Sequence, residues 1–130
     1  MMIGAFSIIL DDENRVLLCK RRDKDLWNLP GGRVEQDESP WAAAVREAQE
    51  EMNVVITIER LVGVYFKQEQ GEIVFQFLAR IEHGTPSKSE ESKETAYFDM
   101  NALPENTAPR QKERITLFSE NPNIMRTLNQ

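Results

Sequence analysis

Three glutamates, Glu47, Glu50 and Glu51, have the spacing that chemistry with a metal ion would need. The apolar residues between 40 and 52 recur at helical spacing. At about 100° per residue, the three carboxylates fall within about 100° of one another on that helix. Their repulsion costs about 0.2–0.5 kcal/mol for each pair. Arg46 could offset part of it, and Mg²⁺ could offset more, because this cation prefers carboxylate oxygens. Taken alone, such a cluster is more often a solvated helix face.

The predicted helix has clear ends and a second side that can anchor it. Ser39 can cap its first turn, Pro40 suits the first helical position, and Asn53 can take the left-handed conformation that ends a helix. An apolar stripe adjoins the glutamate edge. It consists of Trp41, Ala44, Val45, Ala48 and Met52. The sequence therefore predicts a helix that packs on the core by this stripe and leaves three carboxylates at its border.

A glycine loop precedes this helix. Gly31 and Gly32 follow Pro30 and permit backbone angles or close approaches that other residues do not. The loop can therefore come near the glutamate edge, and a backbone carbonyl there is a candidate for a further metal ligand.

The segment from Gly32 to Val54 resembles the Nudix box of the Nudix hydrolases. That pattern is Gly, five residues, Glu, seven residues, Arg-Glu, an aliphatic residue, any residue, Glu-Glu, any residue, Gly and an aliphatic residue. Here it reads Gly32, Glu38, then Arg46 to Val54. Six charged or glycine positions match, which chance would give about once in ten million at a usage of about 7% per position. Asn53 replaces the final glycine, and Ala48 is a small residue in the first aliphatic position.

The resemblance implies a fold and a set of metal ligands. The fold would be a single Nudix-like α/β/α sandwich over residues 1–130, with a mixed β-sheet between helices. The implied ligands are the carboxylates of Glu47, Glu50 and Glu51 and the carbonyl of Gly32. Arg46 would orient these carboxylates, and Glu38 would support the loop–helix geometry. The flanks agree with the family at Leu29-Pro30-Gly31-Gly32 and at Glu94, Tyr97-Phe98 and Leu103-Pro104.

The implied reaction is attack of water on one phosphorus of a diphosphate, with Mg²⁺ as the cofactor and Mn²⁺ as an alternative. Phosphoryl transfer depends on positioning and charge neutralisation more than on covalent chemistry. Glu50 or Glu51 could act as the general base. In this family the base can also come from a loop outside the box. The polar stretch 83–95 offers Glu90, Glu91 and Glu94 for that role.

The sequence indicates the substrate-binding residues less clearly than the metal ligands. Arg21, Arg22 and Arg33 lie near the glycine loop and could hold phosphate oxygens. If Arg21 and Arg22 both lay in a strand, they would point to opposite faces, so only one could reach a substrate. Trp27 could stack on a base, although packing beneath the glycine loop is favoured. Core positions are favoured over base stacking for the phenylalanines at 6, 66, 75 and 77.

The rest of the chain reads as strands with a second helix. Strands are expected at 3–10 and 15–20, joined by a tight polar turn, and at 54–66 and 73–81. Residues 83–95 are predicted to be a mobile surface loop. Pro109 is predicted to open a last helix that runs to about Phe118.

The composition of the chain narrows the classes of binding partner and the cellular compartment expected for the protein. The net charge of −6 argues against broad nucleic-acid binding, which favours a basic face. No apolar run is long enough to cross a membrane, and the start of the chain does not resemble a signal peptide. Cys19 is the only cysteine, which excludes an internal disulfide and favours a reducing cytosol, hence a cytoplasmic protein. A buried structural thiol is favoured over a catalytic one.

Three functions fit these features. The first is a pyrophosphohydrolase that acts on a small nucleotide derivative, such as a nucleoside triphosphate, ADP-ribose or a sugar nucleotide. The second is a non-catalytic nucleotide-sensing module, although 130 residues leave little room for an added DNA-binding domain. The third is an RNA 5′ pyrophosphohydrolase, which the acidic balance disfavours. A homodimer is compatible with the family resemblance, but no residue in the sequence defines an interface.

Overall fold

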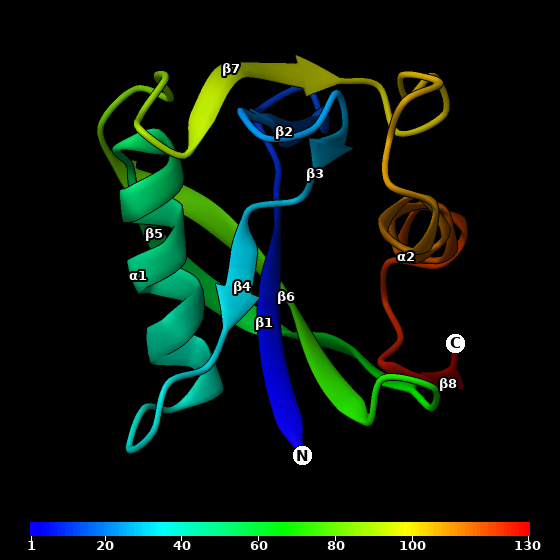
Figure 1. Ribbon diagram of the computed structural model, residues 1–130. Helices are drawn as coiled ribbons and strands as arrows, with labels where there is room; N and C mark the ends of the chain where they lie inside the picture. The colour runs from blue at the N-terminus through cyan, green and yellow to red at the C-terminus, as the bar shows by residue number, and fades with distance from the viewer.

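Two β-sheets of unequal size form the framework of the protein in the computed structural model, which describes all 130 residues (Figure 1). The larger sheet has the strand order β4-β1-β6-β5-β8, and the smaller one has the order β3-β2-β7. The strands are β1 (Met2–Ile9), β2 (Val16–Arg21), β3 (Trp27–Asn28), β4 (Gly31–Arg33), β5 (Val55–Lys67), β6 (Glu72–His83), β7 (Ser92–Phe98) and β8 (Arg126–Asn129). The helices are α1 (Pro40–Met52) and α2 (Pro109–Glu120).

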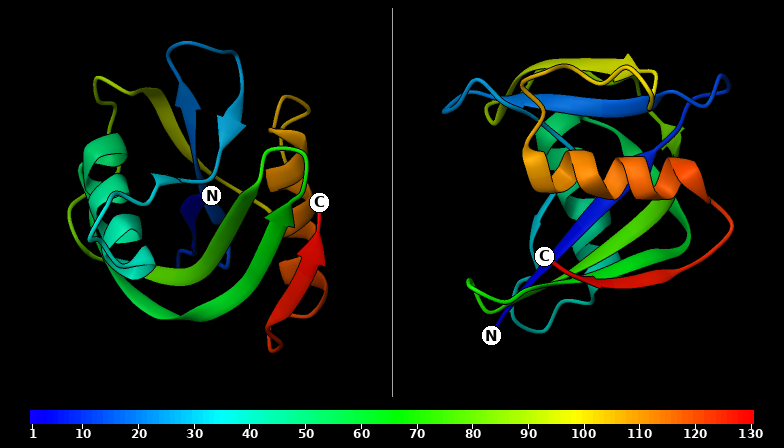
Figure 2. Two further views of the ribbon diagram at one scale, coloured as in Figure 1. Left: turned by 60° about the horizontal axis from the view of Figure 1, so that its bottom comes forward. Right: turned by 90° about the vertical axis from the view of Figure 1, so that its right-hand side faces the viewer.

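The two helices lie on opposite sides of the larger sheet (Figures 1 and 2). Alternate residues of β1 show why. Ala5 and Ile9 join core clusters that include residues of α1, whereas Ile8 joins a cluster with Ile115 and Phe118 of α2. The mixed α/β architecture predicted from the sequence is therefore confirmed. Neither helix is long and apolar enough to cross a membrane.

Helix α1 begins and ends where the sequence predicted. Ser39 Oγ accepts a hydrogen bond from the backbone N–H of Ala42 at 3.1 Å, and Asn53 adopts the left-handed conformation with φ 61°. The apolar stripe needs one correction, since Trp41 is 60% exposed. Helical side chains tilt toward the N-terminus, so a side chain in the first turn extends past the start of the helix. Ala43, Ala44, Ala48 and Met52 make the buried side instead.

The first two strands are joined by the predicted polar turn but belong to different sheets. The polar turn exists, because Asp11 Oδ1 accepts hydrogen bonds from the N–H groups of Glu13 and Arg15. Beyond a single bridge between Leu10 and Val16, however, the chain changes sheets. Strand β1 pairs in parallel with β6, and β2 pairs with β3 and β7. Local turn signals do not specify which distant strands the two segments will join.

Two strands were missed from the sequence. Residues 92–98 form β7, although 92–95 were assigned to a surface loop, and β8 pairs in parallel with β5 (Figure 2, left). Both lie at sheet edges, and their side chains lack apolar alternation because Lys93, Glu94 and most of β8 face solvent. The predicted strands at 54–66 and 73–81 and the last helix differ from β5, β6 and α2 by at most two residues at each end.

Candidate active site

A cavity of about 470 Å³ brings together segments that are far apart in the sequence. It lies between the glycine strand β4, the end of β2, the last turn of α1, the segment before β7 and the first turn of α2. Its walls are Phe6, Arg21, Arg22, Asp23, Asn28, Leu29, Gly31, Gly32, Glu51, Glu90, Glu91 and Gln111. Two predicted metal ligands and two predicted substrate-binding arginines therefore share one cavity with two of the loop glutamates.

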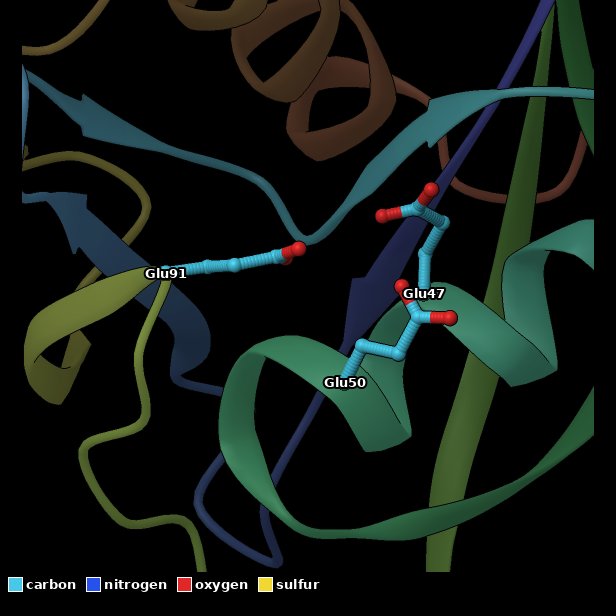
Figure 3. A group of neighbouring side chains, drawn as sticks. All are labelled: Glu47, Glu50 and Glu91. Carbon is cyan, nitrogen blue, oxygen red and sulfur yellow. The ribbon is translucent and has the colours of Figure 1, made fainter.

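Three carboxylates converge beside this cavity. Glu47 and Glu50 reach out from α1, and Glu91 points toward them from the segment before β7 (Figure 3). One oxygen from each lies within 4.8 Å of the others. An all-oxygen donor set of this kind suits a hard cation such as Mg²⁺. Two of the predicted ligands are thus adjacent, and Glu91 joins them from outside the helix.

Glu51, the third predicted ligand, is held separately. It lines the cavity, and its Oε1 accepts a hydrogen bond from the backbone N–H of Gly31 at 2.8 Å. Burial raises the pKa of Glu51 to about 9, and the negative charges of Glu47, Glu91 and Glu50 act in the same direction. Burial also raises the pKa of Glu47, although Arg46 opposes this. The glutamate edge is therefore a site where a bound cation would be strongly favoured.

Glycine is required at the first two positions of β4. A Cβ on Gly32 would lie 2.7 Å from Oε1 and Cδ of Glu47, so the missing side chain lets the backbone approach this carboxylate. Gly31 has φ 154°, and its Cβ would lie 2.4 Å from the carbonyl oxygen of Ala5. Antiparallel pairing of Gly31 and Gly32 with β1 fixes the strand in this place.

Replacing Gly32 by Ala is expected to weaken binding of Mg²⁺ or Mn²⁺ by about 10–100-fold, in the range seen when groups that orient ligands are disturbed. The new methyl group must displace the Glu47 carboxylate. The fold should persist, because the backbone of Gly32 is not left-handed. Calorimetric titration with the metal and urea unfolding measure the two effects.

Gly71→Ala should lower the stability of the fold and leave metal binding intact, the reverse of what is expected for Gly32→Ala. Gly71 lies in a turn with φ 62° and open space around it, so its replacement strains the backbone but leaves the metal affinity unchanged. Equal metal affinity in Gly32→Ala and the wild type would contradict the role given to Gly32.

Arg46 ties the glutamates to the loop before the helix. Its Nε and Nη2 donate to the two carboxylate oxygens of Glu38 at 2.8 and 3.0 Å, and Nη1 donates to Glu47 at 3.0 Å and to Glu50 at 3.3 Å. Nη2 also donates to the carbonyl of Arg33. Glu38 accepts in addition from the N–H of Glu35, and Arg46 lowers the pKa of Glu38. This geometry is compatible with the orienting and supporting roles predicted for Arg46 and Glu38.

The end of α1 fixes the segment that carries Glu90 and Glu91. Asn53 Nδ2 donates to Ser87 Oγ at 2.9 Å and to the carbonyl of Lys88 at 3.2 Å. Ser89 Oγ donates to the carbonyl of Glu51 at 2.7 Å. A glycine, which the family has in the position of Asn53, could not make the two side-chain bonds. The predicted mobile loop is thus bonded to the helix just beside its glutamates.

The predicted substrate residues divide into two groups. Arg21 and Arg22 both line the cavity. The expectation that only one could do so applied to two residues of a strand, and this condition is not met. Arg22 lies beyond the end of β2, and the register of β2 shifts between Lys20 and Arg21. Arg33, by contrast, lines a different surface depression, with residues of the N-terminus.

Trp27 and Glu94 lie outside the cavity. Trp27 is 7% exposed, packs edge-to-face on Phe98 at 5.0 Å and belongs to the core, as favoured from the sequence. Glu94 is an exposed residue of β7 opposite Lys20. Cys19 is buried, and burial raises the pKa of its thiol to about 12, so it is a structural residue.

Sequence reasoning missed four residues of the cavity wall. Phe6 was assigned to the core but is only half-buried and faces the cavity, and Asp23, Asn28 and Gln111 were not considered. Gln111 Oε1 accepts a hydrogen bond from the N–H of Leu29, which joins α2 to the glycine segment. The two residues are 82 positions apart, so no local signal could have indicated this contact.

An acidic helix edge, a glycine strand and two arginines surround one cavity of an α/β fold, an arrangement that suits a divalent cation and an anionic substrate. Comparison with known proteins agrees with this class. The NUDIX domain model matches residues 1–118, and the chain therefore belongs to the Nudix family, as the resemblance of residues 32–54 predicted.

The relatives differ in the substrates that their names give. A Bacillus subtilis (strain 168) protein named "Putative 8-oxo-dGTP diphosphatase" is 46% identical over 71 residues, which are 52% of this chain and 48% of the relative. An ADP-ribose pyrophosphatase of Methanocaldococcus jannaschii is 33% identical over 107 residues, 77% of this chain and 63% of the relative. The chain thus spans only about half to two thirds of the length of these relatives.

Solved structures match nearly the whole chain. A Nudix hydrolase from Nitrosomonas europaea has a TM-score of 0.82 at 26% identity, over 99% of this chain and 79% of that one. An ADP-ribose pyrophosphatase from Streptococcus suis 89-1591 has a TM-score of 0.79 at 21% identity, over 99% of this chain and 98% of that one. At such low identity the second likeness shows the fold alone.

Proposed function

We propose that the protein hydrolyses a pyrophosphate bond in a nucleoside diphosphate linked to another group, with Mg²⁺ as its cofactor. The observation that carries this proposal is the meeting of Glu47, Glu50 and Glu91 within 4.8 Å of one another, next to a cavity that contains Arg21 and Arg22. Carboxylates alone would repel an anionic substrate. Arg21 is paired with Asp23, so the guanidinium of Arg22 and a cation would supply the positive charge that makes the same place attractive to phosphate oxygens.

The donor set fits the cation that the family implies. Glu47 and Glu50 would hold it with Glu51 and the Gly32 carbonyl, and Glu91 adds a carboxylate that the Nudix pattern does not specify. When bound, the cation would neutralise charge on phosphate oxygens and lower the pKa of a coordinated water. Arg21 and Arg22 would position the diphosphate. The proton of the attacking water would pass to a carboxylate that lines the cavity or lies beside it, which leaves Glu50, Glu51, Glu90 and Glu91 as candidates and disfavours Glu94.

The names of the relatives support a small nucleotide as the substrate. They include 8-oxo-dGTP, ADP-ribose and CTP among the compounds acted on. A single buried cysteine supports a reducing compartment, so we place the protein in the cytoplasm. A homodimer is compatible with this proposal and is not required by it.

A substrate screen tests the proposal. Nucleoside triphosphates, dinucleoside polyphosphates, sugar nucleotides and ADP-ribose are incubated with Mg²⁺ or Mn²⁺, and the products are separated by ion-exchange chromatography. We expect metal-dependent cleavage of at least one compound at its pyrophosphate link and no turnover in excess EDTA. A triphosphorylated RNA oligonucleotide is included, and a clear preference for it would favour RNA 5′ processing instead. Binding without turnover across the whole panel would favour a sensing module.

A further inference from the structure

A second cavity, of about 430 Å³, adjoins the first. Phe6 and Gln111 line both cavities, so the second lies directly beside the first, on the other side of these two side chains. The second cavity lies between the first turn of α2 and the adjacent ends of β5 and β6, where it is lined by Lys67, Glu72, Arg110 and Arg114, among others. None of these residues belongs to the Nudix box.

Arg114 is a buried cation in this wall with no counter-ion. It is 2% exposed, and no carboxylate oxygen lies within 4.0 Å of its nitrogens. Nε and Nη2 donate to Gln130 Oε1 at 3.1 and 2.9 Å, whereas Nη1 makes no hydrogen bond to the protein. Aromatic faces flank the guanidinium, with the ring centres of Tyr65 and Phe6 at 5.2 and 5.7 Å. Burial of an unpaired charge is costly, and an anion in the cavity would offset that cost.

The other charges of the cavity also favour an anion. Lys67 and Glu72 neutralise each other in an ion pair of 2.8 Å, which leaves Arg110 and Arg114 as the excess charge. Arg110 forms no ion pair within 4.0 Å. The first turn of α2 adds the partial positive charge of a 12-residue helix, and its N-cap residue, Ala108, makes no side-chain hydrogen bond to the backbone.

We propose that this second cavity binds a phosphate group of the substrate that lies outside the pyrophosphate link being cleaved. The inference rests on the proposed function and adds a substrate class to it: nucleotides that carry an extra phosphate away from the diphosphate. Arg114 and Arg110 are the specificity residues of this subsite. Planar guanidinium groups present paired N–H donors that match phosphate oxygens.

Matched substrate pairs test the specificity. ADP-ribose is compared with its 2′-phosphate, and dephospho-coenzyme A with coenzyme A, in Mg²⁺. The phosphate-bearing member should have a kcat/KM about ten- to a hundredfold higher, as one or two hydrogen bonds between charged groups would give. Arg110→Gln should remove most of this preference. Lys112→Gln, an exposed change in the same helix outside the cavity, should keep it. Equal or reversed preference in the wild type would overturn the inference and indicate an uncharged occupant.

A binding measurement without metal separates this inference from the proposed function. Inorganic phosphate is titrated into ¹⁵N-labelled protein in EDTA, and the Arg114 Nε–H and the amides of Arg110 and Gln111 are followed by NMR. These signals should shift saturably in the wild type and in Lys112→Gln, and only weakly in Arg110→Gln. No saturable shift would overturn the subsite. Saturable binding together with no hydrolysis of any compound would retain the subsite and reject the proposed reaction, whereas hydrolysis without binding or preference would do the reverse. Arg114→Met is a second variant if it folds as the wild type does.

Discussion

Replacement of Glu51 by Gln is expected to lower kcat by about 10²–10⁴-fold, the range that loss of a proton-transfer group gives. Glu51 lines the cavity beside the group formed by Glu47, Glu50 and Glu91, and it accepts a hydrogen bond from the N–H of Gly31. It is therefore placed both to bind a cation and to accept a proton from water. Glutamine keeps the shape and can still accept that hydrogen bond, but it carries no charge. The folded structure should therefore remain while activity is lost.

The same variant should be more stable than the wild type in EDTA at alkaline pH. The pKa of Glu51 is about 9 in the folded protein and near 4.5 in an unfolded chain. Between these values the unfolded chain releases a proton that the folded protein retains, so a rise in pH lowers the free energy of unfolding by at most about 1.4 kcal/mol per pH unit. Below the pKa of the unfolded chain, Glu51 is protonated in both the folded and the unfolded state. Above the pKa of the folded protein, the loss of stability is complete. The uncharged glutamine of the variant does not titrate, so its stability shows no such loss.

Urea unfolding at about pH 5 and about pH 8.5 measures this difference in stability. We expect the two proteins to coincide at the lower pH and the variant to exceed the wild type at the higher one. Glu94→Gln is the matched control, because Glu94 is exposed and outside the cavity, and it should resemble the wild type in activity and stability. Wild-type turnover by Glu51→Gln would reject the role of this residue.

Replacement of Arg46 by Ala should damage both activity and stability. The guanidinium donates to Glu38, Glu47 and Glu50, so its loss leaves these carboxylates without a shared partner. We expect metal affinity and kcat/KM to fall by about 10–100-fold, as for other groups that orient metal ligands. The free energy of unfolding should fall by roughly 1–3 kcal/mol, because hydrogen bonds between charged groups are lost. Lysine should rescue little of this, since it lacks the planar fork.

Arg80→Ala provides the comparison for Arg46. Arg80 pairs with Glu59 on the surface and has a side chain that is 56% exposed, so its removal should cost about 1 kcal/mol or less. Mg²⁺ titration, steady-state kinetics and urea unfolding report the three quantities. If the two variants lost similar stability and Arg46→Ala kept its metal affinity, Arg46 would be an ordinary surface residue.

The helix could be predicted from the sequence because its determinants are local. Ser39, Pro40 and Asn53 set its ends within one turn of each terminus, and the glutamate spacing depends only on the helical repeat. Recognition of the family needed only the residues from Gly32 to Val54. The core position of Trp27 and the oxygen-rich character of the site could be predicted from the sequence for similar reasons.

Long-range pairing accounts for what could not be predicted. Glu91 meets Glu47 across 44 positions of the sequence, and nothing in the polar stretch distinguishes it from Glu90 or Glu94. Strand β7 was missed because an edge strand buries too little of its surface to produce apolar alternation. The sequence also gives no sign that Arg114 is buried without a counter-ion, since an arginine in an amphipathic helix is normally solvated.

The bonds between Asn53, Ser89 and the end of α1 also limit how the length of this segment can vary among related sequences. Surface loops usually accept insertions and deletions, because only their ends are fixed. Here the stretch from Ser87 to Ser89 is held at successive positions by the end of α1, and the N–H of Arg22 donates to the carbonyl of Glu91. One added residue would move Glu91 out of phase with Glu47. Homologues that keep Asn53 should therefore conserve the number of residues between it and this glutamate, whereas the turn around Gly71 should be free to lengthen.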